Sequence, residues 1–450
     1  MIYNFLKILI KFTLRIFYRK VSINKPYVLP KEGPLIVVGN HPNTFMDPLI
    51  VATLFHQQVG FLGNASIFVN KSINAFFAFF KVIPVYRDKD VKPGEKMDNA
   101  KTFRDCFTFL ENKNTILLFP EGSSYHELKL RKIKTGGARI ALGVEMKNDF
   151  QLGLKIIPVG LYYSDPAKFR SKIYVNVGEP ITVSDFQQSF EKDEVNGVQE
   201  LTQTIRQAIE GLTISTSDKE QEELFIKIKR IYKNYLVAHH AIEKNKTEEF
   251  RLTREIANGL QYFKLAFPNK YDYLTLKIER CNELMDHFKT SSKQIVPIKS
   301  KVKKLFIITF GGLYSLIGFP IYVLGLIQNY LPYLSPLWIA KKLTKEAEYY
   351  APIMMSLGIL IFPTYYYFSF FWFDYFVSPP LSLAVLYVIT LPLSGFFVLH
   401  YSQFIKSGIT FLKIHNIINP QEALRAELEE LSKSILGELD DARQTYLKRL

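Results

Sequence analysis

The sequence predicts an α/β domain, a mixed sheet flanked by helices, followed by a helical connector and a C-terminal α-helical membrane segment. Three observations carry this prediction. Short apolar runs alternate with helical stretches over residues 30–212, which is typical of an α/β domain. Residues 216–300 are rich in charge and repeat apolar side chains at helical spacing. Residues 305–401 hold the longest apolar stretches of the chain.

Composition narrows the class of protein. The chain has 450 residues, enough for two or three domains. Its formal net charge of +15 favours anionic partners. Because no zinc-knuckle or RNP-type pattern is present, a membrane surface or a phosphorylated substrate is favoured over nucleic acid. Cys106 and Cys281 lie far apart in the sequence, so neither a disulfide framework nor a cysteine metal site is predicted.

Residues 1–24 are predicted to form an amphipathic helix that lies in a membrane interface. Lys7, Lys11 and Arg15 recur every four residues and therefore share one helical face, while apolar side chains fill much of the rest. A basic stripe on an otherwise apolar helix favours an interfacial position. The alternative is an amphipathic helix that packs only on its own domain.

The α/β domain is expected over residues 25–212. Its strands are predicted from six apolar runs: 34–38, 60–62, 82–86, 115–119, 155–161 and 173–177.

The connector, residues 213–300, is predicted to contain two or three helices. Leu224, Ile228 and Ile231 lie on one helical face, and Pro268 interrupts the pattern. The pair His239-His240 resembles part of a metal site. No acidic or cysteine residue stands at ligand spacing from it, so a solvated helical face is the preferred interpretation.

The membrane region is predicted over residues 301–405. Helices at about 353–375 and 381–401 are each long enough to cross a hydrocarbon layer of ~30 Å. Lysines on both flanks of this pair place both flanks in the cytoplasm by the positive-inside rule. Residues 305–340 are then expected to be re-entrant, a short hairpin or interfacial, and the competing model is three plain crossings. Residues 406–450 are predicted to hold a C-terminal amphipathic helix.

Polar residues follow several of the predicted strands. His41 and Asp47 come after the first strand, Arg87 after the third, and Glu121 after the fourth. Ligand sites of α/β sheets lie outside the carboxyl ends of the strands, so these residues are expected to meet. A histidine beside a carboxylate is a general-base arrangement. Arg87 and Lys134 are candidates for binding an anionic group.

These blocks resemble the glycerolipid acyltransferase superfamily, which comprises glycerol-3-phosphate and 1-acylglycerol-3-phosphate (lysophosphatidate) acyltransferases. The His…Asp block, the block ending in arginine, Phe-Pro-Glu-Gly at 119–122 and an apolar block around Pro158 occur in the order of that superfamily. Lys134-Thr135-Gly136 matches its Lys-x-Gly element. Five residues separate His41 from Asp47 where four are usual, and this resembles the branch that includes the yeast-type glycerol-3-phosphate acyltransferases.

The resemblance implies a membrane O-acyltransferase of phospholipid biosynthesis. It would transfer a fatty acyl chain from a thioester donor to glycerol-3-phosphate, with lysophosphatidate as the alternative acceptor. His41 would take the proton of the acceptor hydroxyl, and Asp47 would orient the imidazole. Substrate binding would involve Arg87, Glu121, Gly122 and Lys134. Backbone amides near His41 or Gly122 are candidates for stabilising the oxyanion.

The expected partners follow from the same resemblance. They are membrane lipids, the glycerol phosphate acceptor, and acyl-CoA or acyl carrier protein as the donor, with no nucleic acid. No metal or nucleotide cofactor is expected, because the thioester supplies the driving force. The catalytic domain is expected on the cytoplasmic face of the membrane. A second alternative is a non-catalytic lipid-binding membrane protein on the same scaffold.

Overall fold

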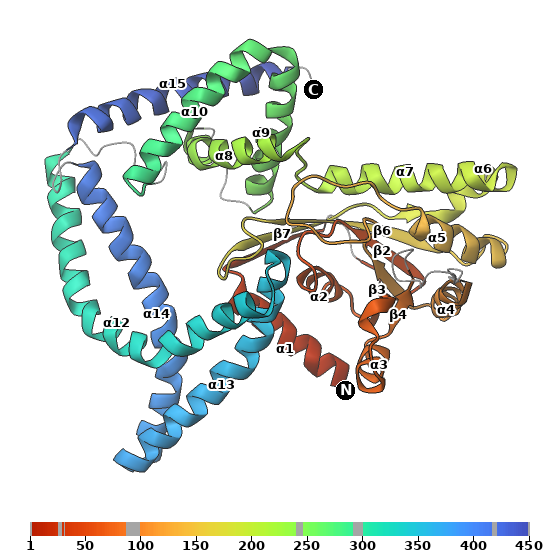
Figure 1. Ribbon diagram of the computed structural model, residues 1–450, viewed down its shortest axis with the longest axis horizontal. Coiled ribbons are helices and arrows are strands. Elements are labelled where there is room, and N and C mark those ends of the chain that lie inside the picture. The colour runs from red at the N-terminus through yellow and green to blue at the C-terminus, as the bar shows by residue number, and fades with distance from the viewer. Residues whose placement is uncertain are drawn as a thin grey trace. The chain divides into compact units, whose positions relative to one another are not determined.

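The chain divides into two compact units. The computed structural model describes residues 2–25, 29–30, 32–86, 100–239, 246–290, 300–415 and 421–448. The first unit comprises Met1–Ser215 together with Glu346–Pro352, and the second comprises Thr216–Lys345 and Ile353–Leu450 (Figure 1).

One mixed sheet of eight strands organises the first unit, in the order β1-β7-β6-β2-β5-β3-β4, with β8 paired to β6. The six predicted strands are all present, and the full set is β1 (Lys20–Asn24), β2 (Leu35–Gly39), β3 (Val59–Asn64), β4 (Val82–Val85), β5 (Thr115–Leu118), β6 (Lys155–Tyr163), β7 (Lys172–Val177) and β8 (Ile181–Thr182). The pairs β2–β5, β2–β6, β3–β5 and β3–β4 are parallel, whereas β7 runs antiparallel to β6. The carboxyl ends of five strands therefore share one edge of the sheet.

Helices cover both faces of this sheet, which is why its central strands are apolar throughout. All residues of β2 and β5 are buried, as expected for parallel strands covered on both sides. Figure 1 shows α5 (Gly136–Lys147), α6 (Gln187–Lys192) and α7 (Glu194–Leu212) on one side of the sheet, and α1 (Ile2–Phe17) and α2 (Met46–Ala52) on the other. The remaining helices, α3 (Lys71–Phe79) and α4 (Ala100–Glu111), flank the β4 end.

The N-terminal segment corrects the helix predicted over 1–24. α1 ends at Phe17, and residues 20–24 form β1, which pairs in parallel with β7. Polar and apolar residues alternate along β1, which is a strand period, but the run directly follows an apolar helix, so the helical pattern continues through it only when the alternation is ignored. The α/β domain therefore begins before residue 25.

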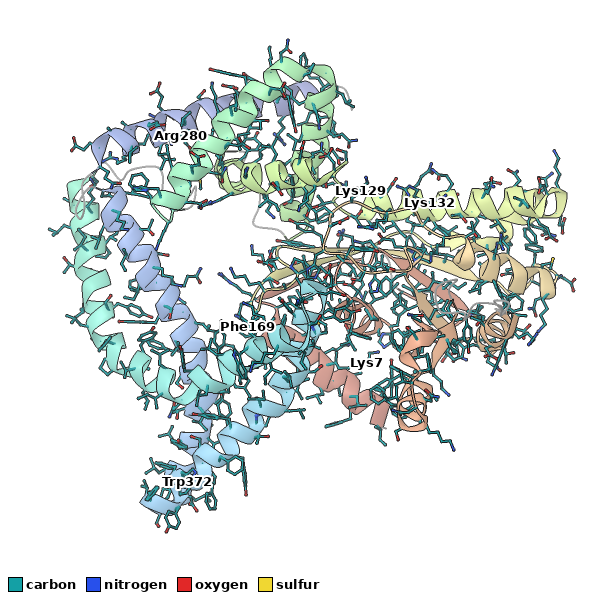
Figure 2. The ribbon with its side chains drawn as sticks, viewed as in Figure 1. Lys7, Lys129, Lys132, Phe169, Arg280 and Trp372 are labelled. Atoms are coloured by element: carbon teal, nitrogen blue, oxygen red, sulfur yellow. The ribbon has the colours of Figure 1, made fainter. Side chains whose placement is uncertain are left out.

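α1 packs on its own domain with one face and exposes another. Leu14 and Phe17 are buried, and the Lys7 ammonium, labelled in Figure 2, donates to the backbone carbonyl of Phe55. Lys7, one of the three residues of the predicted basic stripe, thus contacts the domain. Four apolar side chains remain 62–67% exposed: Ile2, Phe5, Ile8 and Phe12. The interfacial position of α1 stays a prediction, and this exposed apolar face supports it.

Part of the second unit is a group of four packed helices, α8 (Lys219–His239), α9 (Lys246–Ala266), α10 (Pro268–His287) and α15 (Glu422–Leu447). Over its described residues, 213–239, 246–290 and 300, the predicted connector therefore contains three helices, and the C-terminal helix packs on them. Ion pairs join α10 to α15, between Lys277 and Glu438 at 2.6 Å and between Arg280 and Glu427 at 2.6 Å (Arg280 is labelled in Figure 2).

Among the described residues, three further helices are long and apolar enough to cross a membrane: α12 (Lys301–Leu343), α13 (Tyr350–Val377) and α14 (Leu381–Ile414). α12 is one continuous helix, so the short hairpin considered for 305–340 is wrong. Figure 1 shows α12 bending along its length, which fits the three prolines it contains, Pro320, Pro332 and Pro336. α13 and α14 each extend beyond the helices predicted at 353–375 and 381–401.

A buried polar cluster joins these three helices. Asn329 of α12 donates to the Ser394 hydroxyl of α14 at 3.1 Å, and the Tyr366 hydroxyl of α13 donates to the Asn329 side-chain oxygen at 2.6 Å. Gly325 lets α12 and α14 approach, since a Cβ there would lie 2.7 Å from a methyl group of Val398. Small residues and interhelical hydrogen bonds are the usual means by which apolar helices associate in a membrane.

Candidate active site

The register of the sheet brings the ends of β2 and β5 together. Val38 pairs with Leu118 in the parallel ladder, so His41 and Glu121, each three residues further on, emerge side by side. The backbone N–H of His41 donates to Glu121 Oε1 at 2.9 Å. Two polar blocks that lie 80 residues apart in the sequence therefore form one site.

His41 and Asp47 are in direct contact. The distance from His41 Nδ1 to Asp47 Oδ2 is 2.9 Å, with the imidazole 17% exposed and the carboxylate fully buried. The imidazole stacks on the ring of Phe119, with centroids 4.1 Å apart. A carboxylate at Nδ1 favours the tautomer with its hydrogen on that nitrogen, which leaves the lone pair of Nε2 to accept a proton.

A tight turn accommodates the five residues between the histidine and the aspartate. Thr44 adopts a left-handed conformation with φ of 32°, and α2 begins two residues later, so Asp47 lies in its first turn. The backbone N–H of Asn43 donates to Asp47 Oδ2 at 2.6 Å. The turn thus closes on the same carboxylate oxygen that contacts His41.

A tyrosine from β6 completes the hydrogen bonding of Asp47. The Tyr163 hydroxyl donates to Asp47 Oδ1 at 2.5 Å. Burial, and secondly the charge of Asp47, hold the pKa of Tyr163 well above its usual value, and the same two causes raise the pKa of nearby Tyr18. Both phenols therefore stay protonated, and Tyr163 acts as a fixed donor.

We expect Tyr163→Phe to destabilise the first unit, because it leaves one oxygen of a buried carboxylate without its donor. Hydrogen bonds to charged groups contribute about 1.5–3 kcal/mol, and the free energy of unfolding should fall by that amount in urea titrations of the protein in detergent micelles. The matched control is Tyr125→Phe, which removes the hydroxyl of an exposed tyrosine of the same unit and keeps its ring. Equal unfolding midpoints for the two variants would contradict this role of Tyr163.

Glu121 joins two loops. Its Oε1 accepts from the backbone N–H of His41, and its Oε2 accepts from the backbone N–H of Arg131 at 3.1 Å. Desolvation raises the pKa of this carboxyl, and the two backbone hydrogen bonds act in the opposite direction. Its geometry is that of a residue that organises the site.

The backbone N–H groups of His41 and Gly122 both have partners within the protein. The backbone N–H of His41 donates to Glu121, and the backbone N–H of Gly122 donates to the Phe119 carbonyl at 3.0 Å. The expectation that backbone amides near His41 or Gly122 stabilise the oxyanion stays a prediction, and it now concerns the neighbours of these two residues.

Lys134 lies beside Gly122. Gly122 has φ of +75°, a conformation that favours glycine, and a Cβ there would lie 2.9 Å from Lys134 Nζ, so the ammonium group of Lys134 lies close to this residue. Lys134 is exposed and stands two residues before α5, whose N-terminus carries partial positive charge. This end of the site is therefore suited to an anion.

The other basic residues of this loop are placed differently. The guanidinium of Arg131 stacks on Tyr125 at 3.3 Å from the ring centroid and pairs with Glu127 at 3.0 Å. Lys129 and Lys132, labelled in Figure 2, are exposed. Arg87 lies outside the described residues, so its predicted position in the site stays a prediction.

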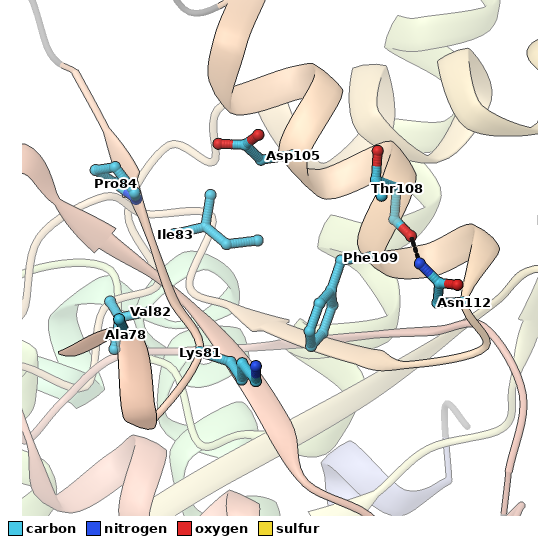
Figure 3. Close-up of a pocket in the computed structure, with 9 residues that line it drawn as sticks. All are labelled: Ala78, Lys81, Val82, Ile83, Pro84, Asp105, Thr108, Phe109 and Asn112. Carbon is cyan, nitrogen blue, oxygen red and sulfur yellow. Dashed lines mark hydrogen bonds between the residues drawn. The ribbon is translucent and has the colours of Figure 1, made fainter. Parts of the chain in front are cut away.

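A hollow elsewhere in the first unit holds none of the predicted site residues. It lies between β4 and α4, and Figure 3 shows its lining: Ala78, Lys81, Val82, Ile83, Pro84, Asp105, Thr108, Phe109 and Asn112. Over the described residues no group of three or more histidine, cysteine, aspartate or glutamate side chains could hold a metal ion. The side chain of His239 and the whole of His240 lie outside the described residues.

Comparisons with known proteins show similarity to acyltransferases. Residues 20–162 match the family model described as Acyltransferase. The chain is 23% identical over 418 residues to glycerol-3-phosphate O-acyltransferase 1 of Saccharomyces cerevisiae, covering 73% of this chain and 54% of that protein. It is 32% identical over 142 residues to glycerol-3-phosphate O-acyltransferase 2 of the same yeast, covering 31% of this chain and 19% of that protein.

Two more similarities complete the comparison. An uncharacterized acyltransferase of Schizosaccharomyces pombe is 25% identical over 345 residues, covering 58% of this chain and 50% of its own length. The crystal structure of a 1-acyl-sn-glycerophosphate acyltransferase from Thermotoga maritima has a TM-score of 0.33 and 20% identity, covering 46% of this chain and 78% of that one. The chain spans about half the length, or less, of the curated relatives it matches. Residues 20–162, which carry the His41–Asp47 pair and Glu121, form a domain of the acyltransferase family.

Proposed function

We propose that the protein is a membrane O-acyltransferase that moves a fatty acyl chain from a thioester donor to glycerol-3-phosphate. The observation that carries this proposal is the contact of 2.9 Å between His41 and a fully buried Asp47 at the carboxyl edge of the sheet. Lys134 supplies a positive charge at the same edge. The two named yeast relatives support glycerol-3-phosphate as the acceptor, and lysophosphatidate is the alternative.

The reaction follows from the orientation of the imidazole. His41 Nε2 takes the proton from the acceptor hydroxyl while its oxygen attacks the carbonyl carbon of the thioester. The tetrahedral intermediate then breaks its C–S bond, and the imidazolium returns the proton to the leaving thiolate. Asp47 holds Nδ1–H throughout and offsets the imidazolium charge. General-base catalysis of this kind contributes about 10²–10⁴-fold.

Charge at the edge of the site supports a phosphorylated acceptor. Lys134 and the N-terminus of α5 face the same end of the sheet as His41, and both favour a phosphate. Arg87 would add a bidentate contact. A lipase or esterase is disfavoured because the sequence contains no Gly-x-Ser-x-Gly nucleophile turn.

An acceptor panel tests the proposal. Purified protein in micelles is supplied with labelled acyl-CoA or acyl carrier protein and with glycerol-3-phosphate, dihydroxyacetone phosphate, lysophosphatidate or lysophosphatidylcholine. We expect labelled lysophosphatidate from glycerol-3-phosphate. Product from lysophosphatidate alone would select the alternative acceptor. No product with any acceptor would favour the non-catalytic lipid-binding protein.

The placement of the domain relative to the membrane belongs to the same proposal. We infer that α12 starts on the side of the acyltransferase domain, and the observation that supports this is that the three candidate spans among the described residues all lie after residue 300. Residues 346–352 belong to the first unit, so α12 also ends on that side. α12 therefore does not cross, and α13 and α14 cross as a pair. The flanking lysines support the cytoplasm as the shared side.

Cysteine labelling tests this arrangement. Lys345→Cys, after α12, should react with a membrane-impermeant maleimide only in inverted vesicles. Ser378→Cys, between α13 and α14, should react only in intact cells. The native Cys106 and Cys281 are buried and give a low background. Labelling of position 345 in intact cells would support the competing model of three plain crossings.

A further inference from the structure

A short segment between two apolar helices lies against the turn that carries His41 and Asp47. Residues 346–352, which include the 3-10 turn Ala347–Tyr349 and the first three residues of α13, are grouped with the first unit, although α12 and the rest of α13 belong to the second. The Thr44 hydroxyl donates to the backbone carbonyl of Glu348 at 2.8 Å. The rings of Phe45 and Tyr349 lie next to each other, with centroids 6.4 Å apart.

Thr44 is the residue on which this turn depends. Its φ of 32° is a left-handed conformation that is unfavourable for a β-branched side chain. It is buried, and its backbone N–H donates to the Ser124 hydroxyl at 2.8 Å. Ser124 thus holds the backbone of Thr44 from one side, and the carbonyl of Glu348 holds its hydroxyl from the other.

We propose that residues 346–352 are a positioning element of the acyl-transfer site. By holding Thr44 and Phe45 they keep the turn in the conformation that places Asp47 against His41. This inference rests on the proposed function. The segment does not contact the reacting atoms, and it acts through the turn. It also means that the segment joining two membrane helices is a structural part of the catalytic domain.

The kinetic test separates the hydroxyl from the shape of the side chain. Thr44→Val keeps the branched shape and removes the donor, whereas Thr44→Ser keeps the donor. We expect Thr44→Val to lower kcat about threefold to tenfold, the equivalent of one lost hydrogen bond, with the KM values of donor and acceptor unchanged. Thr44→Ser should stay within about twofold of wild type. Lys345→Ala, exposed and directly before the segment, is the matched control.

A crosslink tests the contact without relying on activity. Phe45 and Tyr349 are 49% and 37% exposed, so cysteines in their place are accessible to a short bis-maleimide. The double variant Phe45→Cys/Tyr349→Cys should give an internally crosslinked chain of altered mobility. The control Phe45→Cys/Tyr375→Cys should not, because Tyr375 lies 26 residues further along, near the other end of α13.

The outcomes separate this inference from the proposed function. Absence of the crosslink would overturn the inference, and so would a crosslink combined with wild-type kcat in both Thr44→Val and Tyr349→Ala. If the crosslink forms but the wild-type protein is inactive with every acceptor, the proposed function would be overturned. The crosslink would then show that residues 346–352 still contact the turn, so the inactivity would not come from a loss of this contact. Crosslinking, a reduced kcat in Thr44→Val and its rescue in Thr44→Ser would support the inference.

Discussion

Replacing His41 by alanine should lower kcat for acyl transfer about 10²–10⁴-fold, the contribution of a general base. The fold should survive this change. The hydrogen bond between the loop after β2 and Glu121 is donated by the backbone N–H of residue 41, and alanine retains this group. The KM of the acyl donor should also change little, because the imidazole acts on the acceptor hydroxyl. Initial rates with labelled donor over a range of both substrates measure the separate effects.

His56→Ala is the matched control for this prediction. His56 is an exposed histidine of the same domain, and its replacement should leave kcat and both KM values as in wild type. If the His41 and His56 variants were equally active, His41 would not be the base. If His41→Ala also lost its cooperative unfolding transition, the loss of activity would report on folding, and His41→Gln would then be the variant to measure.

Asp47→Asn should lower kcat by about 10–150-fold, and this is the second largest effect we expect. The asparagine oxygen can still accept from the backbone of Asn43 and from His41 Nδ1–H, while the Tyr163 hydroxyl turns to accept from the new amide. Geometry is thus retained, and the negative charge beside the imidazolium is lost. A hydrogen bond to a charged partner contributes about 1.5–3 kcal/mol, and each 1.36 kcal/mol corresponds to a factor of ten in rate.

The comparison with Asp47→Ala separates charge from packing. Alanine removes the oxygen that accepts from the backbone N–H of Asn43, so this variant should lose stability as well as activity, whereas Asp47→Asn should lose mainly activity. Asp165→Asn, an exposed aspartate on a nearby loop, controls for a change of net charge. Wild-type kcat in Asp47→Asn would contradict the role of the Asp47 charge in stabilising the imidazolium.

Local sequence was sufficient to predict the strands of the sheet and to predict that the polar residues after them lie close together. Apolar runs such as 34–38 and 115–119 are each followed by polar or turn residues. Parallel strands bring their carboxyl ends to one edge of the sheet. The position of His41 near Glu121 follows from the pairing of Val38 with Leu118. The strand at 20–24 was not predicted, because an edge strand directly after an amphipathic helix continues its apolar pattern.

The residues that hold the site in place could not be predicted, because nothing in the local sequence marks them. Tyr163 follows the predicted run 155–161 by two residues, yet its partner Asp47 lies 116 residues away. Asn43 belongs to the recognisable His-Pro-Asn block, but only the turn shows that its backbone donates to Asp47. Ser124 and the carbonyl of Glu348 act on Thr44 from separate parts of the chain.

By itself the sequence determined the class of fold and the residue types at the ends of the strands, since hydrophobic periodicity and turn chemistry are local properties. Tertiary structure alone decided which hydrogen bonds those residues make. The oxygens of Asp47 and Glu121 are satisfied by groups from other strands and loops, and the register of the sheet fixes those distances. Residues 346–352 belong to the first unit for the same reason, since contacts between distant parts of a chain form only when it folds.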